Sequence, residues 1–262
     1  MKVQPMKGIS AVIITFNEER NIARCIDSLA DIASEVLVVD SFSNDRTIEI
    51  ARKKGARVIQ REWEGYAATK NYANSLVQNE YILSVDADEA LSCHLKDSIL
   101  KEKQRGLKGV YEFSRLTNYC GKWIRYGGWY PDRKIRLFPK DGSLWNGEFV
   151  HEKLSFSGDP VKTTLKGDLL HYSYYTIQDH RLRIEKYSVL EAKKLQANRK
   201  RFFWVGLVLG PPLQFIKMYF LKAGFLDGYY GFAVAAMSAF AKFKRYNEAI
   251  KLNNKTGKTI SE

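Results

Sequence analysis

Residues 81–89 read Y-I-L-S-V-D-A-D-E, an apolar run that ends in two aspartates separated by one residue. A short apolar run of this kind is typical of a strand buried in a parallel sheet. In an extended chain, residues i and i+2 point to the same face, so Asp86 and Asp88 would present their carboxylates together. Because two like charges a few ångströms apart repel unless water or a cation screens them, the stretch predicts a buried strand that delivers an acidic site.

The two aspartates are suitable ligands for a divalent metal ion. Carboxylate oxygens suit Mg²⁺ or Mn²⁺, and proteins commonly complete such a site with substrate phosphates rather than with further side chains. A nucleotide diphosphate is the natural partner of this arrangement. The alternative is that Asp86 and Asp88 cap a helix that begins near Leu91, because Asp is common at helix N-termini. An isolated D-x-D motif does not decide between the two, so the residues before it matter.

The composition allows one main domain and indicates an anionic partner. A chain of 262 residues, 45% of them hydrophobic, can bury the core of one α/β domain with an appendage. The net charge of +13 favours nucleic acid, a membrane surface or a phosphorylated substrate as the partner. Residues 1–8 lack the apolar core of a signal peptide, and Cys25, Cys93 and Cys120 lack metal-ligand or redox spacing. We therefore expect a cytoplasmic protein.

Strand and helix patterns alternate along the first third of the chain. Short, β-branched apolar runs predict four strands, at residues 9–16, 35–39, 57–61 and 81–85. Apolar residues at helical spacing predict three intervening helices, at residues 22–33, 46–54 and 66–77. Asp45 is the expected N-cap of the middle helix, and Gly55 is its expected C-cap. This alternation predicts an α/β fold with a doubly wound, mostly parallel sheet and helices on both faces.

Polar clusters follow three of these strands, at residues 15–18, 40–45 and 86–89. In open parallel sheets, ligands bind beyond the carboxyl ends of the strands, near the point where the strand order reverses. Neither G-x-G-x-x-G nor G-x-x-x-x-G-K-[ST] occurs, which disfavours a dinucleotide-binding fold and a P-loop. The clusters therefore predict a ligand site of another kind at this edge of the sheet.

Four segments in this order resemble the family 2 glycosyltransferases, which have the GT-A fold. They are A-V-I-I-T-F-N-E-E at 11–19, V-L-V-V-D-S-F-S-N-D-R-T at 36–47, T-K-N-Y-A at 69–73 and I-L-S-V-D-A-D-E at 82–89. Two later segments are similar to the lipopolysaccharide-core β-glucosyltransferase-like branch: V-H-E at 150–152 and G-F-L-D-G-Y-Y-G at 224–231. The resemblance implies a sugar transferase that uses a nucleotide-diphosphate sugar, with UDP-glucose favoured, together with Mg²⁺ or Mn²⁺.

The resemblance also implies roles for individual residues. Three residues would line the nucleotide pocket: Thr15, Asn17 and Glu18. Asp40 would hold the base or ribose, and Lys70 with Asn71 would face the nucleotide sugar. Asp86 would contact the ribose or a metal-bound water, and Asp88 would ligate the metal ion.

The chain departs from the family pattern at two positions. Many relatives carry a second acidic residue where this chain has Ser41, and Arg is common where it has Lys70. Simpler interpretations also stay open, because Asp40 and Asp45 suit a turn and a cap, and exposed lysines are the rule on helices.

Residues 109–138 combine short β segments with aromatic and basic side chains. Because residues 126–131 (Y-G-G-W-Y-P) are too rich in glycine for a packed element, we predict an acceptor-side wall here. It would include Trp129 and Tyr130, whose apolar faces and polar tips suit sugar rings, although such aromatics also pack in cores. Arg133 or Arg136 would meet a phosphate, since arginine offers forked donors.

Glu152 is the expected catalytic base because it matches the base position of the family that the chain resembles, and Glu148 is the reserve candidate. Displacement at an anomeric carbon requires removal of the acceptor hydroxyl proton, which a carboxylate within hydrogen-bond reach can accept. Surface charge is the alternative for both residues. His171 follows an apolar stretch and is a further candidate metal ligand, with a hydrogen-bonded structural histidine as the alternative.

The last part of the chain differs in character. Residues 181–201 contain eight basic and two acidic residues, followed by an apolar run at 202–213 and an uncharged run at 228–241. Both runs are shorter than the ~20 residues of a spanning helix, and Pro211 and Pro212 are expected to break the first one. The pattern predicts peripheral binding to an anionic membrane, with packed core helices as the alternative.

The predicted organisation has two parts. Residues 1–175 would form the GT-A domain, with its nucleotide-sugar half at about 9–90 and its acceptor half at about 91–175. Residues 176–262 would form a basic and apolar helical region. The expected protein is an inverting, metal-dependent hexosyltransferase, peripheral on the inner face of the cytoplasmic membrane, that acts on a lipid-linked or oligosaccharide acceptor such as lipopolysaccharide core.

Two other functions remain open from the sequence. A polyprenyl-phosphate sugar synthase shares the nucleotide half, and its phosphate acceptor would depend less on Glu152. A basic nucleic-acid-binding protein would also explain the charge, but no recognised motif occurs and the basic residues lie beside apolar runs. We therefore expect no nucleic-acid partner.

Overall fold

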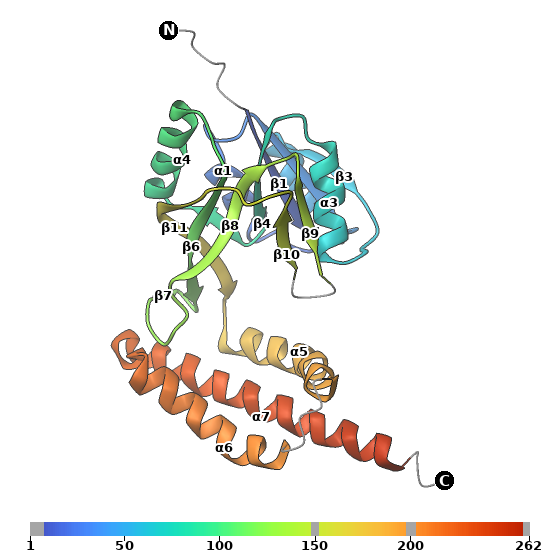
Figure 1. Ribbon diagram of the computed structural model, residues 1–262, viewed down its shortest axis with the longest axis vertical. Helices are drawn as coiled ribbons and strands as arrows, with labels where there is room; N and C mark the ends of the chain where they lie inside the picture. The colour runs from blue at the N-terminus through green and yellow to red at the C-terminus, as the bar shows by residue number, and fades with distance from the viewer. Residues whose placement is uncertain (1–7, 148–151, 198–202, 259–262) are drawn as a thin grey trace. The chain divides into compact units, whose positions relative to one another are not determined.

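The computed structural model describes residues 8–147, 152–197 and 203–258 (Figure 1). The chain forms two compact units, and each unit is built from two separate stretches of the sequence. The α/β unit comprises residues 1–116 and 132–172, and the helical unit comprises residues 117–131 and 173–262.

The first half of the α/β unit is a parallel sheet. Its strands are β1 (Ile9–Thr15), β2 (Glu35–Asp40), β3 (Arg57–Gln60) and β4 (Tyr81–Asp86). They lie in the order β3-β2-β1-β4, and all neighbours are parallel. Thr15 lies opposite Asp40, and Ile14 lies opposite Asp86, so the carboxyl ends of the three strands meet at one edge.

Helices cover both faces of this sheet. They are α1 (Ile22–Ser28), α2 (Thr47–Lys53), α3 (Tyr66–Leu76) and α4 (Cys93–Arg105). Alternate residues of β1 enter two hydrophobic clusters, one with Ile22 of α1 and Leu95 of α4, and the other with Ala73 of α3. A strand buried on both faces favours apolar residues at successive positions, so the largely apolar sequence of β1, in which Ser10 is the one internal polar residue, follows from this layering. The predicted doubly wound α/β arrangement is confirmed.

The second half of the sheet is mixed. It adds β5 (Glu89–Leu91), β6 (Val110–Tyr119), β8 (Asp132–Pro139) and β11 (Lys162–Tyr174), in the continuing order β4-β8-β6-β11-β5. A separate hairpin joins β9 (Ser143–Asn146) to β10 (Lys153–Phe156). Ser92 caps α4 by accepting a hydrogen bond from the backbone of Leu95. The alternative in which Asp86 and Asp88 cap this helix is therefore wrong.

The described part of the helical unit contains three long helices and two short ones. They are α5 (Ile177–Ala197), α6 (Phe203–Ile216), the π-helix η1 (Lys217–Leu221), the 3₁₀-helix η2 (Gly224–Asp227) and α7 (Gly228–Lys258). The short strand β7 (Lys122–Ile124) pairs with the end of β6. Helix α7 packs against both α5 and α6.

Asp227 ties the 117–131 segment to the helices of this unit. Its buried carboxylate accepts hydrogen bonds from the backbone nitrogens of Arg125 (3.0 Å) and Tyr126 (2.8 Å). The acidic residue of G-F-L-D-G-Y-Y-G therefore satisfies backbone donors that would otherwise lack a partner, which is a structural role.

Helix α6 continues through Pro211 and Pro212, so the prediction that these prolines break it is wrong. Two prolines remove two backbone donors and crowd the preceding turn. Close packing against α7 offsets this cost, because Gly206 and Gly210 lie against the ring of Tyr246, where a Cβ at Gly206 would collide. Tertiary contact here overrides the local preference.

Within the described residues, Phe203–Leu221 is long and apolar enough, by length and composition, to cross a membrane. Its mean hydropathy is 1.2, and 11% of this apolar stretch is buried. This stretch is longer than the predicted apolar run at 202–213, because α6 continues beyond Pro211 and Pro212 and is followed directly by η1. The second run behaves differently: Ala233, Val234 and Ala235 of α7 are buried in a hydrophobic cluster, as the packing alternative expects.

Candidate active site

The loops that follow β1 and β2 are joined by hydrogen bonds. The backbone nitrogen of Asn17 donates to Ser43 Oγ (2.8 Å), and Asn17 Oδ1 accepts from the backbone of Asn44 (2.9 Å). The backbone of Glu18 donates to Thr47 Oγ1 (2.7 Å). Asn17 has a left-handed backbone with φ of 55°, which Asn tolerates better than most residues. The loops therefore form one connected rim at the carboxyl edge of the sheet.

Asp40 is fully buried below this rim. Its Oδ2 accepts from the backbone nitrogen of Ser43 (2.8 Å), and its Oδ1 accepts from the Ser43 hydroxyl (2.5 Å). Asp45 similarly accepts from the backbone of Thr47 (2.9 Å), next to the start of α2. The turn interpretation describes the Asp40 contacts, and Asp40 thereby shapes the loop in which we predict the base or ribose to bind. The prediction of Asp45 as the N-cap of α2 is wrong, because Arg46 holds that position.

Thr15 leaves a polar group without a partner at the same edge. Its hydroxyl and that of Ser41 are buried and make no hydrogen bond within the described part of the chain. Buried hydroxyls are normally satisfied, so an unpartnered pair between two loops is a suitable place for the polar atoms of a ligand.

Lys70 is the central cation of the site. It is 1% exposed, and its Nζ lies 3.3 Å from Asp86 Oδ1 and 3.0 Å from Glu152 Oε1. It also lies over the ring of Trp145, 4.6 Å from the centroid. Asn71 holds that strand in place, because its side chain exchanges two hydrogen bonds with the backbone of Trp145. The alternative of a solvated helix charge is wrong for Lys70.

Arg136 reaches the same carboxylate from β8. The register of β8 against β6 shifts next to Arg136, which is left as the extra residue of a β-bulge. Such a bulge redirects a side chain, and here Nη2 lies 2.6 Å from both Asp86 Oδ2 and Glu89 Oε1. Arg136 is 4% exposed, so the structure places it behind Asp86 and not on an open acceptor-side wall. Arg133 is exposed, 3.7 Å from Glu112.

These contacts keep Asp86 ionised. Burial by itself would raise the pKa of Asp86, but the charges of Arg136 and Lys70 outweigh it and hold that pKa far below its ordinary value. Burial opposes the charge of Arg136 too, yet Asp86 and Glu89 raise its pKa above the ordinary value. Because both oxygens of Asp86 already face cations, a metal ion would have to compete with Lys70 and Arg136 for them.

Asp88 has different partners. Strand β4 ends at Asp86, and residues 87–88 form a turn, so the prediction of two carboxylates on one extended face is wrong. Asp88 Oδ2 lies 3.2 Å from Nε2 of His171, and the backbone of Tyr172 donates to the carbonyl of Asp88 (2.8 Å). The two carboxylates therefore have separate surroundings.

Asp88 and His171 are the residues that could hold a divalent ion. Across residues 8–147, 152–197 and 203–258, no group of three or more His, Cys, Asp or Glu side chains is arranged to bind a metal. Two ligands nevertheless fit Mg²⁺ or Mn²⁺, which usually keep several waters and take the rest from substrate phosphates. Asp88 and His171 therefore fit the predicted metal as a partial ligand set that substrate and water would complete.

The other predicted residues are placed as follows. Glu148 lies outside the described residues, as does His151 of the V-H-E motif. Trp129 belongs to the helical unit, where it packs against the rings of Tyr119 and Tyr174. Tyr130 belongs to the same unit, with the Arg125 guanidinium 5.5 Å from its ring centroid. Their acceptor-side role stays a prediction.

The sequence interpretation missed Glu89, Arg115 and Trp145. Glu89 is buried, and its Oε2 accepts from the backbone of Asp86 (3.0 Å) while Arg115 lies 3.4 Å from its Oε1. Arg115 also binds Asp132 (2.6 Å), which extends the network. Glu89 is the last residue of the D-A-D-E motif, and a buried carboxylate requires a cation nearby. The arginines of the later strands were therefore the sequence feature that could have predicted its partners.

Comparison with protein families and known proteins supports one family. The model of "Glycosyl transferase family 2" matches residues 10–147. An uncharacterized glycosyltransferase of Rickettsia typhi is 33% identical over 276 residues, covering 98% of this chain and 91% of that protein. The lipopolysaccharide core biosynthesis glycosyltransferase LpsC of Rhizobium meliloti is 27% identical over 257 residues, covering 92% and 94%.

Among solved structures, glucosyl-3-phosphoglycerate synthase of Mycobacterium tuberculosis is 25% identical over 44% of this chain and 45% of that chain, with a TM-score of 0.35. A score of this size supports no inference about donor or metal.

Proposed function

Because the chain belongs to glycosyltransferase family 2, we propose that it is an inverting, metal-dependent enzyme that transfers a hexose from a nucleotide sugar to a lipid-linked glycan. One observation carries the proposal: buried Lys70 joins Asp86 of β4 to Glu152, at the edge where the predicted donor residues lie. A buried cation between two carboxylates from distant segments, at the strand edge where ligands bind in such sheets, supports a functional site.

The donor would bind at the rim formed by the loops after β1 and β2. Thr15, Asn17 and Glu18 would line the nucleotide pocket, and Asp40 would position the loop that meets the base or ribose. The unpartnered hydroxyl of Thr15 supports this placement. UDP-glucose is the favoured donor on the family resemblance.

Asp88 and His171 would hold the Mg²⁺ or Mn²⁺ ion. When bound, this ion would neutralise the developing charge of the diphosphate leaving group. Lys70 would face the nucleotide sugar, and Asp86 would hold Lys70 in that position through their 3.3 Å ion pair.

Glu152 would act as the base. Its carboxylate would accept the proton of the acceptor hydroxyl while that oxygen forms its bond to the anomeric carbon and the diphosphate leaves. Attack from the face opposite the leaving group inverts the configuration. The ion pair with Lys70 holds the carboxylate in one orientation, which reduces the cost of positioning it for proton transfer.

The acceptor would be a lipopolysaccharide core. The relative named for lipopolysaccharide core biosynthesis aligns with almost the whole chain, which supports this acceptor class over a polyprenyl phosphate. The exposed apolar side chains of α6 and η1 support a position at the membrane surface. The proposed location is the inner face of the cytoplasmic membrane.

A two-step assay tests this function. Purified protein with Mn²⁺ or Mg²⁺ is first screened for hydrolysis of nucleotide sugars, and the active donor is then offered with lipopolysaccharide-core acceptors. We expect UDP-glucose hydrolysis and transfer with inversion of the anomeric configuration. Transfer to polyprenyl phosphate alone would show that the acceptor is a lipid phosphate and not lipopolysaccharide core. Retention of configuration at the anomeric carbon would refute the inverting mechanism.

A further inference from the structure

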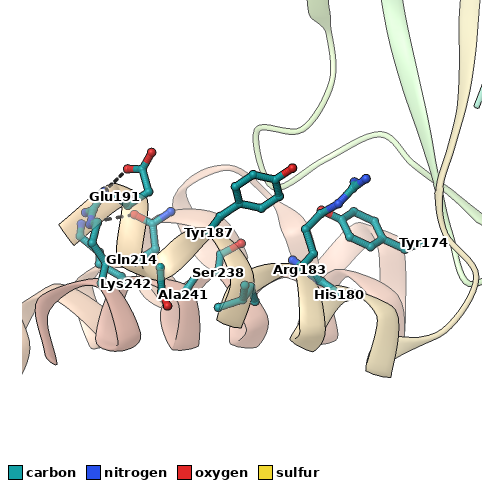
Figure 2. Close-up of a pocket in the computed structure, with 12 residues that line it drawn as sticks. Tyr174, His180, Arg183, Tyr187, Glu191, Gln214, Ser238, Ala241 and Lys242 are labelled. Carbon is teal, nitrogen blue, oxygen red and sulfur yellow. Dashed lines mark hydrogen bonds and ion pairs between the residues drawn. The ribbon is translucent and has the colours of Figure 1, made fainter. Parts of the chain in front are cut away.

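A groove lies inside the helical unit, between α5 and α7 (Figure 2). It encloses about 390 Å³. Two helical stripes face each other across it: Arg183, Tyr187 and Glu191 from α5, and Ser238, Lys242 and Arg245 from α7. Gln214 of α6 and Tyr174 of β11 complete its wall. None of these residues belongs to the site described above.

The groove has an excess of positive charge. Three cations line it, Arg183, Lys242 and Arg245, against one carboxylate, Glu191. His180 also lines the groove, but burial, with a smaller contribution from the charge of Arg183, lowers its pKa to about 4, so it is neutral at physiological pH. The net charge of the lining is therefore positive by two.

Arg245 and Lys242 lie together at one end of the groove. Arg245 Nη1 lies 3.6 Å from Glu191 Oε2, and Lys242 Nζ lies 3.5 Å from Gln214 Oε1 (Figure 2). Arg245 Nε is buried and makes no hydrogen bond to any described residue. A buried guanidinium nitrogen without an acceptor costs free energy, and an incoming anion removes that cost.

Each end of the groove carries a cation. Arg183 and Tyr174 lie at one end, Lys242 and Glu191 lie at the other, and the ring of Tyr187 lies between them (Figure 2). Arg183 and Glu191 are eight residues apart on α5, which corresponds to about 12 Å along the helix axis. Tyrosine rings offer an apolar face and a polar tip, the combination that suits a sugar ring between two charged positions.

We propose that this groove binds the anionic saccharide portion of the glycan acceptor, with its phosphate esters on Arg245, Lys242 and Arg183. Arginine binds phosphate oxygens through paired donors, and lysine adds a point charge. The inference rests on the proposed function, because the transferase needs an acceptor of this class. It assigns that acceptor a second point of attachment on the helical unit.

A phosphate ester could also come from a bulk phospholipid headgroup. The two sources share the same chemistry, so the test uses a soluble saccharide and a vesicle in separate arms. The soluble probe is a deacylated lipopolysaccharide-core oligosaccharide, before and after enzymatic removal of its phosphates. The vesicle probe is phosphatidylcholine with and without phosphatidylglycerol.

The first measurement is equilibrium binding of the soluble probe to the full chain at low salt. We expect the phosphorylated oligosaccharide to bind at least tenfold more tightly than the dephosphorylated one, as for charge-assisted hydrogen bonds. Arg245→Gln and Lys242→Gln should each remove most of that difference, and Arg245→Lys should retain part of it. Lys251→Gln is the matched control, since Lys251 is exposed on the same helix and pairs with Glu248.

The second measurement is transfer kinetics with the same oligosaccharide. The groove variants should raise KM for the phosphorylated acceptor by about tenfold and change kcat little, because the groove residues are proposed to bind the acceptor and not to take part in the chemical step. Oligosaccharide binding requires neither the donor nor turnover. A failure to bind would therefore contradict the groove proposal, whereas the transfer assays test the proposed function separately. Equal binding of both oligosaccharides, or variants that bind like wild type, would overturn the proposal. Loss of vesicle binding without loss of saccharide binding would also overturn it, in favour of a phospholipid site.

Discussion

The α/β unit contains 24 basic and 23 acidic residues, for a net charge of +1, whereas the helical unit contains 18 basic and 6 acidic residues, for +12. Nearly all of the excess charge of the chain therefore lies in the smaller unit. In the α/β unit, charges act as individual pairs around Asp86, Glu89 and Glu152. The helical unit instead presents a collective positive field, which suits an extended anionic partner.

The units also differ in where they place apolar side chains. Every residue of β1 is buried, whereas eight large apolar side chains of α6 and η1 are exposed: Trp204, Val205, Val208, Leu209, Leu213, Ile216, Phe220 and Leu221. Exposed apolar patches of this size mark interaction sites, and with positive charge nearby they fit an anionic membrane surface. The comparison teaches that the total charge of +13 describes neither unit.

The largest effect should follow Asp88→Asn. This change removes the charge of the proposed metal ligand but leaves a side chain of the same size, so turnover should fall by about 10³-fold or more while the fold persists. The measurement is nucleotide-sugar turnover with titrated Mn²⁺, with circular dichroism as the check on folding. Full activity in EDTA would contradict the metal assignment.

Lys70→Met tests whether charges in the α/β unit act individually. Removing this buried cation leaves Asp86 and Glu152 facing each other without it, which should cost about 3 kcal/mol of unfolding free energy. Lys186→Met in the helical unit is the matched control, and an exposed lysine should change stability by less than about 0.5 kcal/mol. If urea denaturation shows that both variants lose the same unfolding free energy, the contrast between individually paired charges in the α/β unit and solvated charges in the helical unit is wrong.

Glu152→Gln should lower kcat by about 10²-fold, since glutamine keeps the shape but cannot accept the proton. Nucleotide affinity, measured by titration with UDP, should change little. If Glu148→Gln is inactive and Glu152→Gln is active, the two residues exchange roles.

The smallest effect concerns the collective charge. The double variant Lys217→Gln and Lys222→Gln should weaken binding to anionic vesicles by about 10- to 30-fold at low salt, from roughly 1 kcal/mol per lysine. The control double variant, Lys53→Gln and Lys101→Gln, makes the same charge change in the α/β unit and should bind like wild type. Binding that ignores lipid charge and salt, or protease protection on both sides of a membrane, would rule out the peripheral arrangement.

The sequence by itself determined the elements of the first half of the α/β unit. The apolar runs of β1 and β4, the helical spacing in α1 and α3, and the polar residues after each strand predicted the sheet, its layers and the edge that holds the candidate site. These features depend on side chains a few residues apart, because strand and helix periods repeat over two to four positions. Local patterns are sufficient for such features.

Only the tertiary structure decided which charges meet. Lys70 and Glu152 are 82 positions apart, and Asp86 and Arg136 are 50 apart, so no local period relates them. The bulge that redirects Arg136, the turn that separates Asp88 from Asp86, and the contact with Tyr246 that accompanies Pro211 and Pro212 in α6 all depend on distant strands or helices. Burial makes an unpaired charge costly, and whether a lysine is solvated or central to a site is settled by what packs around it after the chain has folded.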